Sequence, residues 1–241
     1  MLISYSEFQK LFSKCDLNII TEQYDKFAKY ATLLVEWNEK INLTAITAPE
    51  EIAQKHFLDS VLPFYLSENL NGLIRTEDIR LIDVGTGAGF PSCPLKIMQD
   101  NIKITLLDSL NKRINFLKEV SDSLGLAANC IHSRAEDGAK KGSALRESFD
   151  IATARAVANL PVLCEYCIPY VKVGGVFCAL KGSDCKEELE NAQKIIETLG
   201  GKIIENTEYT LPNGDKRTLI VIKKVRATPL KYPRPKAKMK Y

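Results

Sequence analysis

The chain has 241 residues, of which 45% are hydrophobic and 26% are charged, the composition of an ordinary globular protein. This length accommodates one large domain, or one domain with a small extension. No apolar run approaches the roughly 18–20 residues that span a bilayer, and the first residues lack the charged and apolar segments of a secretion signal. Seven cysteines in such a chain favour free thiols in a reducing compartment. We therefore expect a cytoplasmic protein without a membrane segment.

Two of the cysteines, Cys164 and Cys167, form a C-x-x-C pair. The pair falls in an apolar stretch that is predicted to be a helix, and no second pair stands at the spacing of a zinc site. Packing in the core is therefore favoured over a metal or redox role, and we expect no metal.

The net charge of +3 is unevenly distributed along the chain. Residues 216–241 contain ten Lys or Arg and no acid, which leaves 23 of the 33 basic residues against 30 acids, a formal charge of −7, in residues 1–215. A basic tail on a mildly acidic body indicates a polyanionic partner, although a solvated terminus is the commoner reason for such a tail. We take residues 226–241 as this basic C-terminal tail.

Residues 1–72 are predicted to form a helical N-terminal subdomain, because apolar residues recur in them at helical spacing. The second helix is expected to end at Trp37, and residues 38–47 are expected to form a linker. A third helix should begin at Pro49, which suits a first helical turn. The apolar residues of this third helix should pack on the following domain: Ala53, Phe57, Val61, Phe64 and Tyr65.

Three alternating glycines follow the apolar run 81–84, and a helix-forming segment follows the glycines. A strand that breaks at glycines and feeds a helix is the first βα turn of a doubly wound sheet, where a ligand can lie against bare backbone. Dinucleotide sites place their third glycine where Phe90 stands here. The spacing therefore favours S-adenosylmethionine, which has no pyrophosphate, with Gly85 and Gly87 as cofactor contacts; a purely structural turn is the alternative.

Asp108 ends the next apolar run, 19 residues after Gly89. Many α/β nucleotide binders place at this point the carboxylate that accepts both ribose hydroxyls. The alternative is that Asp108 caps the helix that follows it. We favour ribose binding.

Strands and helices alternate through residues 73–225, the predicted main domain, with nearly continuous apolar strands. Residues 212–215 join the last two strands, a link too short for a parallel crossover, so these strands should form an antiparallel hairpin. Five parallel strands and a terminal hairpin form the Rossmann-like sheet of class I methyltransferases. The predicted strands are 79–84, 103–108, 128–132, 149–153, 174–180, 202–209 and 217–223, and the predicted helices between them are 91–99, 111–124, 158–170 and 185–199.

Ligands of such sheets bind at the carboxyl ends of the strands. Residues 132–137 follow the third strand and are placed to meet an adenine base. Arg155 ends the fourth strand and should point into the cleft, although a surface ion pair is the alternative. Several cations near these ends could contact an RNA phosphate backbone, although each alone would ordinarily be a solvated charge. These candidates are Lys112, Arg113, Arg134, Lys181 and Arg217.

Much of the chain resembles the bacterial RsmG/GidB family of 16S rRNA guanine-N7 methyltransferases. The matching segments are WNEKINLTAIT (37–47), HFLDS (56–60), DVGTGAGFP (83–91), LLDSLNKRINFLKE (106–119), SRAED (133–137), ARAVANL (154–160), ALKG (179–182) and KRTLIVIKK (216–224). The combination of HFLDS with DVGTGAGFP makes the resemblance specific.

The resemblance implies transfer of a methyl group from S-adenosylmethionine to N7 of a guanine in the 530 loop of 16S rRNA. The partner would be the small ribosomal subunit or its precursor. The cofactor contacts that it implies are Gly85, Phe90, Ala135, Glu136 and Arg155. Two departures stand out: Ser92-Cys93 where the family usually has Gly-Ile, and a chain end, KYPRPKAKMKY, that diverges after its first residues.

Guanine N7 carries a free lone pair and no proton, so its methylation requires no general base. The chain has two histidines, His56 and His132, and no evident catalytic triad. Catalysis would then rest on alignment of the reactants, a role that we assign to Arg155. Two other functions stay open: methylation of a protein or small molecule, and non-catalytic nucleotide or RNA binding, against which the intact glycines and Asp108 argue. We expect a monomer.

Overall fold

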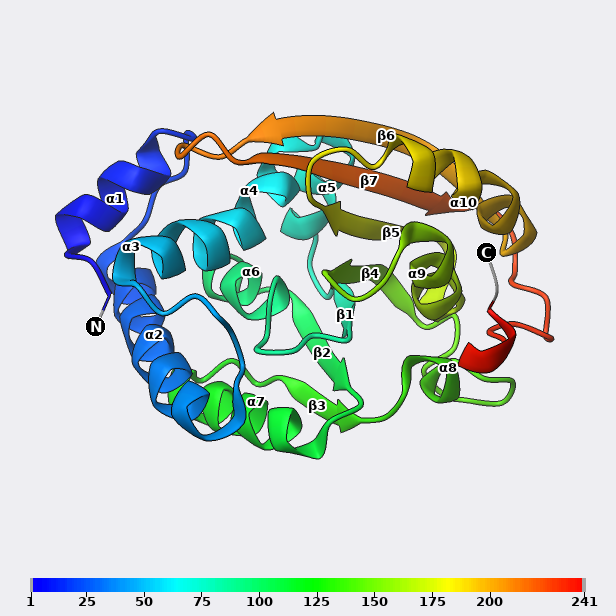
Figure 1. Ribbon diagram of the computed structural model, residues 1–241, viewed down its shortest axis with the longest axis horizontal. Helices are drawn as coiled ribbons and strands as arrows, with labels where there is room; N and C mark the ends of the chain where they lie inside the picture. The colour runs from blue at the N-terminus through cyan, green and yellow to red at the C-terminus, as the bar shows by residue number, and fades with distance from the viewer. Residues whose placement is uncertain (1, 240–241) are drawn as a thin grey trace.

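The computed structural model describes residues 2–239, and its centre is a mixed sheet of seven strands in the order β3-β2-β1-β4-β5-β7-β6 (Figure 1). β1 to β5 pair in parallel, and β7 runs antiparallel to both β5 and β6. This is the predicted sheet, and every strand boundary lies within three residues of the expected one. The strands are β1 (Arg80–Val84), β2 (Lys103–Asp108), β3 (Asn129–His132), β4 (Phe149–Arg155), β5 (Val171–Lys181), β6 (Gly201–Thr210) and β7 (Lys216–Lys224).

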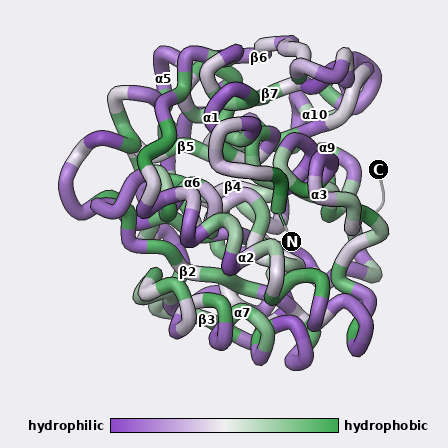
Figure 2. The backbone as a smooth tube through the Cα atoms, turned by 90° about the vertical axis from the view of Figure 1, so that its left-hand side faces the viewer, coloured by the Kyte–Doolittle hydropathy of each residue, from purple (hydrophilic) through white to green (hydrophobic). Residues whose placement is uncertain are grey.

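The burial of each strand explains its place in the sheet. β1 and β2 are buried at every residue after the first, as expected for central parallel strands covered on both faces. β6 alternates between exposed and partly buried residues over most of its length, which suits its position at the edge. In Figure 2 hydrophobic stretches follow strands such as β2 and β5, and hydrophilic segments lie mainly on the outside.

Helices cover both faces of the sheet and form two hydrophobic cores. One core lies under α6 (Ser92–Met98), α7 (Asn111–Leu124) and the N-terminal helices. The other lies under α9 (Leu160–Cys167), the 3-10 turn η3 (Ile168–Tyr170) and α10 (Lys186–Thr198), with the short α8 (Ala135–Gly138) beside it. None of the helices within residues 2–239 is long and apolar enough to cross a membrane.

The N-terminal residues are helical, as predicted, but the second helix ends later than expected. α2 continues four residues past Trp37 to Ile41, where Asn42 adopts a left-handed conformation with φ of 49° and donates its N–H to the Asn38 carbonyl. Asparagine tolerates this conformation and closes the helix, so the predicted end at Trp37 is wrong. The elements of this region are α1 (Tyr5–Ser13), α2 (Thr21–Ile41), α3 (Pro49–Glu51), the π-helix η1 (Ile52–Leu58), α4 (Asp59–Leu66), α5 (Glu68–Asn71) and the 3-10 turn η2 (Leu73–Arg75).

The third helical segment begins at Pro49, as predicted, and joins the N-terminal helices to the sheet domain. It passes from α3 through the π-helical turn η1 into α4 without a break. Phe57 and Val61 are fully buried in the core that also holds Leu81 of β1. The expected packing of this apolar stripe on the sheet domain is confirmed. The π-helical turn was not predicted.

The chain leaves β7 and turns back along the sheet domain beside α8 and α9, where it ends in the 3-10 turn η4 (Lys236–Lys238) (Figure 1). Thr228 is 3% exposed and Met239 is 9% exposed, so the basic tail has buried contacts. Lys240 and Tyr241, which belong to the predicted tail, lie outside the described residues.

Candidate functional site: two cavities at the ends of the parallel strands

The glycine-rich turn after β1 fits closely against the N-terminal helix α2. All three of its glycines have positive φ. A Cβ atom at Gly89 would lie 2.5 Å from the hydroxyl oxygen of Tyr30 and 2.8 Å from Sγ of Cys93. The Tyr30 hydroxyl donates a hydrogen bond to the Ala88 carbonyl. Because only a residue without a side chain permits this approach, Gly89 sets how closely α2 and the turn pack.

Asp83 lies in β1 and holds the same turn through hydrogen bonds in the protein interior. Its carboxylate is fully buried, and Oδ2 accepts hydrogen bonds from the Thr86 hydroxyl at 2.9 Å and the Ser92 N–H at 3.3 Å. Burial raises the pKa of Asp83 to about 7, although the hydrogen bonds act in the opposite direction. Ser92 contributes its backbone N–H to this contact, so the bond does not depend on which side chain stands there.

Asp108 lies at the end of β2 and bridges two loops. Its Oδ2 accepts a hydrogen bond from the Gly87 N–H at 3.0 Å, and its Oδ1 accepts one from the Leu110 N–H at 2.9 Å. Nη1 of Arg113 lies 3.4 Å from Oδ2. The carboxylate therefore holds both the glycine turn and the residues that lead into α7. It does not cap that helix, whose N-cap residue is Leu110, so the capping alternative is wrong. Ribose binding by Asp108 stays a prediction.

A cavity of about 570 Å³, the larger cavity, opens at the carboxyl ends of β1 to β4. Its volume lies within the range of about 300–1,000 Å³ that is typical of small-molecule sites. Its lining comes from four strand ends, α9 and the C-terminal tail: Val84, Gly85, Leu107, Ser109, Leu110, Ser133, Arg134, Ala135, Glu136, Val157, Ala158, Asn159, Val162, Tyr166 and Lys236.

The larger cavity brings together three of the predicted cofactor contacts, Gly85, Ala135 and Glu136. A Cβ at Gly85 would lie 2.9 Å from a methyl group of Val157. The absence of a side chain at Gly85 therefore allows the ends of β1 and β4 to approach each other closely. Gly87 and Asp108 are joined by a hydrogen bond beside this cavity, but neither residue lines it.

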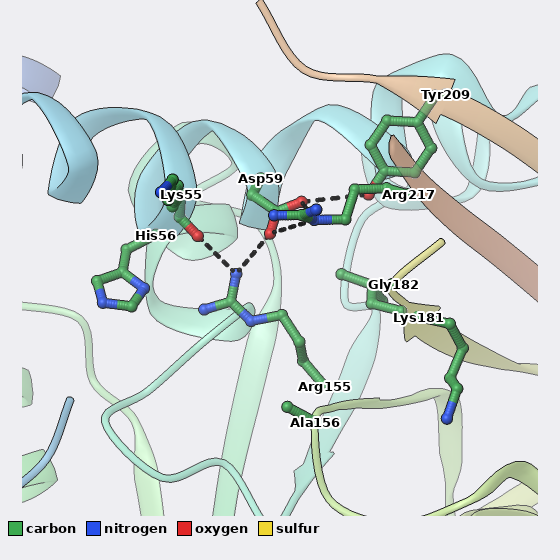
Figure 3. Close-up of a pocket in the computed structure, with 10 residues that line it drawn as sticks. Lys55, His56, Asp59, Arg155, Ala156, Lys181, Gly182, Tyr209 and Arg217 are labelled. Atoms are coloured by element: carbon green, nitrogen blue, oxygen red, sulfur yellow. Dashed lines mark hydrogen bonds and ion pairs between the residues drawn. The ribbon is translucent and has the colours of Figure 1, made fainter. Parts of the chain in front are cut away.

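The remaining predicted cofactor contacts, Phe90 and Arg155, lie together in a different place. The Arg155 guanidinium stands over the Phe90 ring, 5.0 Å from its centroid. Arg155 lines a second opening of about 340 Å³, the smaller cavity. The residues that line it are Lys55, His56, Asp59, Arg155, Ala156, Leu180, Lys181, Gly182, Tyr209 and Arg217 (Figure 3).

Asp59 is the centre of the charges in the smaller cavity. Arg155 Nη1 lies 3.4 Å from Oδ2 of Asp59, and Arg217 Nε lies 3.2 Å from both carboxylate oxygens (Figure 3). The Tyr209 hydroxyl donates to Oδ1 at 3.4 Å. Arg155 also donates to the Lys55 carbonyl at 3.4 Å. One buried carboxylate thus positions two guanidinium groups that come from β4 and β7.

His56 also lines the smaller cavity, and its ring stacks on Phe90 with centroids 4.5 Å apart. Its Nε2 lies 2.8 Å from the Thr44 hydroxyl. Burial, and then the positive charge of Arg155, lower the pKa of His56 to about 3. His56 is therefore uncharged at neutral pH. His132 lies elsewhere, on the surface at the end of β3, with Nε2 3.0 Å from the Ser109 carbonyl.

The predicted RNA-binding cations lie in three different places. Lys181 and Arg217 line the smaller cavity, and Arg134 lines the larger one. Lys112 is exposed in the first turn of α7, and Arg113 beside it contacts Asp108. Lys181 forms an ion pair of 2.7 Å with Glu188. Their roles toward RNA stay predictions.

Four polar or charged residues of the smaller cavity were not predicted as site residues: Lys55, His56, Asp59 and Tyr209. His56 and Asp59 stand within the HFLDS segment, and that segment was the available signal for them. No local pattern marked Tyr209, because it lies 150 positions from Asp59 in the sequence and meets it only in the folded chain. Within residues 2–239 no cluster of three or more His, Cys, Asp or Glu could hold a metal ion, and Cys164 and Cys167 are free and buried.

Comparison with known proteins shows the family of this chain. The model of GidB, the rRNA small subunit methyltransferase G family, matches residues 23–217. The chain belongs to this family. The ribosomal RNA small subunit methyltransferase G of Clostridium botulinum (strain Eklund 17B / Type B) is 54% identical over 220 residues, 90% of this chain and 89% of the relative. That of Streptococcus gordonii is 50% identical over 229 residues, 95% of this chain and 94% of the relative.

Solved structures of lower identity share the fold of this GidB-family chain. A branched-chain polyamine synthase mutein from Thermus thermophilus, with 5'-methylthioadenosine bound, has a TM-score of 0.58 at 12% identity and covers 84% of this chain and 65% of its own. M. jannaschii TYW2 in complex with AdoMet has a TM-score of 0.50 at 12% identity, covering 64% and 74%. The predicted family and the class I, Rossmann-like methyltransferase fold are both confirmed.

Proposed function

We propose that this chain transfers a methyl group from S-adenosylmethionine to N7 of a guanine in the 530 loop of 16S rRNA, within the small ribosomal subunit or its precursor. Membership of the rRNA small subunit methyltransferase G family supports methylation of ribosomal RNA with this donor. The observation that carries the choice of N7 is the smaller cavity, which is lined by cations and by one histidine, His56. The His56 ring stacks on Phe90, and its pKa of about 3 makes it too weak a base to remove a proton at neutral pH.

The larger cavity would hold the cofactor. Gly85 offers bare backbone at the end of β1, and Ala135 and Glu136 line the same cavity at the end of β3, where an adenine base would lie. Asp108 stands beside the glycine turn with both oxygens partly used by backbone N–H groups. A carboxylate has about four lone-pair sites, and Arg113 Nη1 is a third donor at 3.4 Å, so about one site is left for a ribose hydroxyl and Arg113 would have to move for the second. The bound cofactor supplies a methyl group on a positively charged sulfur.

The smaller cavity would hold the target nucleotide. Ala156 lines the smaller cavity, whereas Val157 and Ala158 line the larger one, so the two cavities meet at the turn after β4. A base that enters the smaller cavity would therefore approach a cofactor in the larger one across this turn. Lys55, Lys181 and Arg217 supply positive charge for the phosphates of the nucleotide.

Arg155 would align the reactants. Its guanidinium is held between the Phe90 ring, the Asp59 carboxylate and the Lys55 carbonyl, and its side chain is only 16% exposed. Such a fixed group can orient a nucleotide, and alignment is the main requirement when the acceptor atom carries a free lone pair. No proton has to leave N7, so the uncharged His56 has no proton to remove and stays a packing partner of Phe90.

The test is to map N7-methylguanine in 16S rRNA from cells with and without this protein. We expect the modified guanine in the 530 loop to disappear with the protein and to return when the native chain is restored. A 530 loop that keeps its N7-methylguanine without the protein would contradict the proposal.

A further inference from the structure

The C-terminal tail is fastened to the domain by Arg146. Nη1 of Arg146 donates to the carbonyl of Tyr232 at 2.7 Å, and Nη2 donates to that of Thr228 at 2.8 Å and to that of Pro229 at 3.4 Å. The same guanidinium donates to the Ala139 carbonyl at 2.8 Å, in the loop after α8. One side chain of the domain thus holds three carbonyls of the tail.

A buried ion pair fixes the tail a second time. Glu165 of α9 is fully buried, and its carboxylate accepts hydrogen bonds from the Arg234 backbone N–H at 3.0 Å and from Arg234 Nε at 2.8 Å. Arg234 also lies over the Tyr232 ring, 5.6 Å from its centroid. A buried carboxylate without its partner is costly, so Glu165 favours the docked position of the tail.

These two contacts bring Lys236 to the larger cavity. Lys236 opens the 3-10 turn η4 and lines this cavity together with Glu136 and Tyr166, next to α8 and α9. In Figure 1 this last turn, in red, lies beside α8 and α9. Lys238 belongs to the same turn and, like Lys236, is exposed, but it does not line the cavity. The chain therefore offers a matched pair of lysines two residues apart.

We propose that the docked tail is a wall of the cofactor site and that Lys236 is a cofactor-binding residue at its adenosine end. The inference rests on the proposed assignment of the larger cavity to the cofactor. Lys236 stands with residues 133–136 and Tyr166, the part of the cavity that would surround the adenine. An ammonium group there can donate to the ring nitrogens of adenine, which are acceptors. Glu165 and Arg146 are positioning residues, because they act through the tail.

The test compares Lys236→Ala with Lys238→Ala by calorimetric titration of the full chain. Two ligands are used: S-adenosylmethionine, and 5'-methylthioadenosine, which lacks the amino-acid portion. We expect Lys236→Ala to weaken the binding of both ligands by the same factor, about threefold to tenfold, the worth of one hydrogen bond to an exposed charged group. Lys238→Ala should bind both ligands as the native chain does. Thermal unfolding without ligand should be alike for the two variants.

Glu165→Gln tests the positioning role, because it keeps the side-chain volume and removes the charge that holds Arg234. We expect it to weaken both ligands by a factor similar to that of Lys236→Ala. The inference is overturned if Lys236→Ala binds both ligands within about twofold of the native chain, or if Lys238→Ala loses as much affinity.

A blocking variant separates this inference from the assignment of the cavity. Ala158→Trp places an indole in the larger cavity, which Ala158 lines. If Ala158→Trp abolishes binding while Lys236→Ala has no effect, the cavity assignment stands and the role of the tail is wrong. If Ala158→Trp folds and binds S-adenosylmethionine normally, the cavity assignment itself fails.

Discussion

Arg155 of β4 and Asp59 of α4 face each other in the smaller cavity, with Nη1 of the arginine 3.4 Å from Oδ2 of the carboxylate. The pair is nearly buried, with side-chain exposures of 16% and 7%. It connects the N-terminal helical region to the catalytic sheet, 96 positions apart in sequence. The helical region therefore contributes directly to the proposed nucleotide site.

We predict that Arg155→Ala lowers single-turnover methyl transfer about a hundredfold, because loss of alignment by about an ångström can cost that much. Cofactor affinity should change by less than about threefold, because Arg155 lines the smaller cavity and not the larger. Single-turnover rates and calorimetric titration measure the two effects. Equal losses in rate and in cofactor affinity would indicate that Arg155 contacts the cofactor, as the family resemblance implied.

Asp59→Asn should also slow methyl transfer, but by less, because the amide can still accept a hydrogen bond from one guanidinium. We expect a loss of about tenfold in single-turnover rate, since a charge-assisted hydrogen bond is exchanged for a neutral one. A rate equal to that of the native chain would show that Asp59 does not position Arg155.

Asp108→Ala should weaken binding of S-adenosylmethionine by about 1.5–3 kcal/mol, the worth of charge-assisted hydrogen bonds. Part of the effect will come from the glycine turn, because Asp108 holds the Gly87 N–H. Titration with adenosine and with 2'-deoxyadenosine separates the two causes. If Asp108 binds the ribose, the native chain should prefer adenosine and the variant should lose that preference. An unchanged preference would contradict ribose binding.

The glycine turn gives a prediction about stability. Gly89→Ala should destabilise the fold by about 3 kcal/mol, because its new Cβ would lie 2.5 Å from the Tyr30 hydroxyl oxygen at a φ of 94°. Gly87→Ala is the matched control: its φ is also positive, at 60°, but no atom lies within 4 Å of its Cβ. We expect a loss of about 1 kcal/mol for that variant. Denaturant unfolding without cofactor measures both, and equal losses would refute the steric argument.

His56 should make the fold sensitive to acid. Its pKa in the folded state, about 3, lies below its usual value of 6.5, so its contribution to stability is present above pH 6.5 and is lost as the pH falls from 6.5 to 3. The whole loss is on the order of 3–5 kcal/mol. Asp83 acts in the opposite direction. Its pKa in the folded state is raised to about 7, so its ionisation lowers the stability of the fold as the pH rises from 4 to 7.

The comparison of variants isolates the histidine. The difference in unfolding free energy between the native chain and His56→Gln should shrink as the pH falls from 6.5 to 4, while Asp83 affects both equally. His132→Gln, which alters an exposed histidine at the end of β3, should follow the native curve. A constant difference between the native chain and His56→Gln would contradict the assignment.

The sequence predicted the sheet well because its signals are local. Each parallel strand is an apolar run bounded by polar or glycine residues, and the link at 212–215 allowed only a hairpin. The end of α2 was predicted too early. Residues 38–41 contain no helix-breaking residue, so the helix continues through them and ends at Asn42, which adopts the left-handed conformation.

The residues that line the two cavities could be predicted only in part. Gly85, Ala135 and Glu136 follow strand ends, so topology alone brought them to the larger cavity. Asp59 with Tyr209, and Glu165 with Arg234, are pairs separated by 150 and 69 positions. Such contacts depend on how helices and tail pack on the sheet, which no local pattern reveals. Glu165 lies in an apolar stretch of sequence, and nothing in that stretch indicates that Arg234 of the tail donates hydrogen bonds to it.

The most direct test of the proposed activity is to locate the methyl group that the purified chain transfers. Small ribosomal subunits or their 16S rRNA, taken from cells without the protein, are incubated with S-adenosylmethionine that carries a labelled methyl group. We expect label on N7 of one guanine in the 530 loop with the native chain, and about a hundredfold less with Arg155→Ala. Label on another atom or outside this loop, or no transfer by a chain that binds the cofactor, would contradict it.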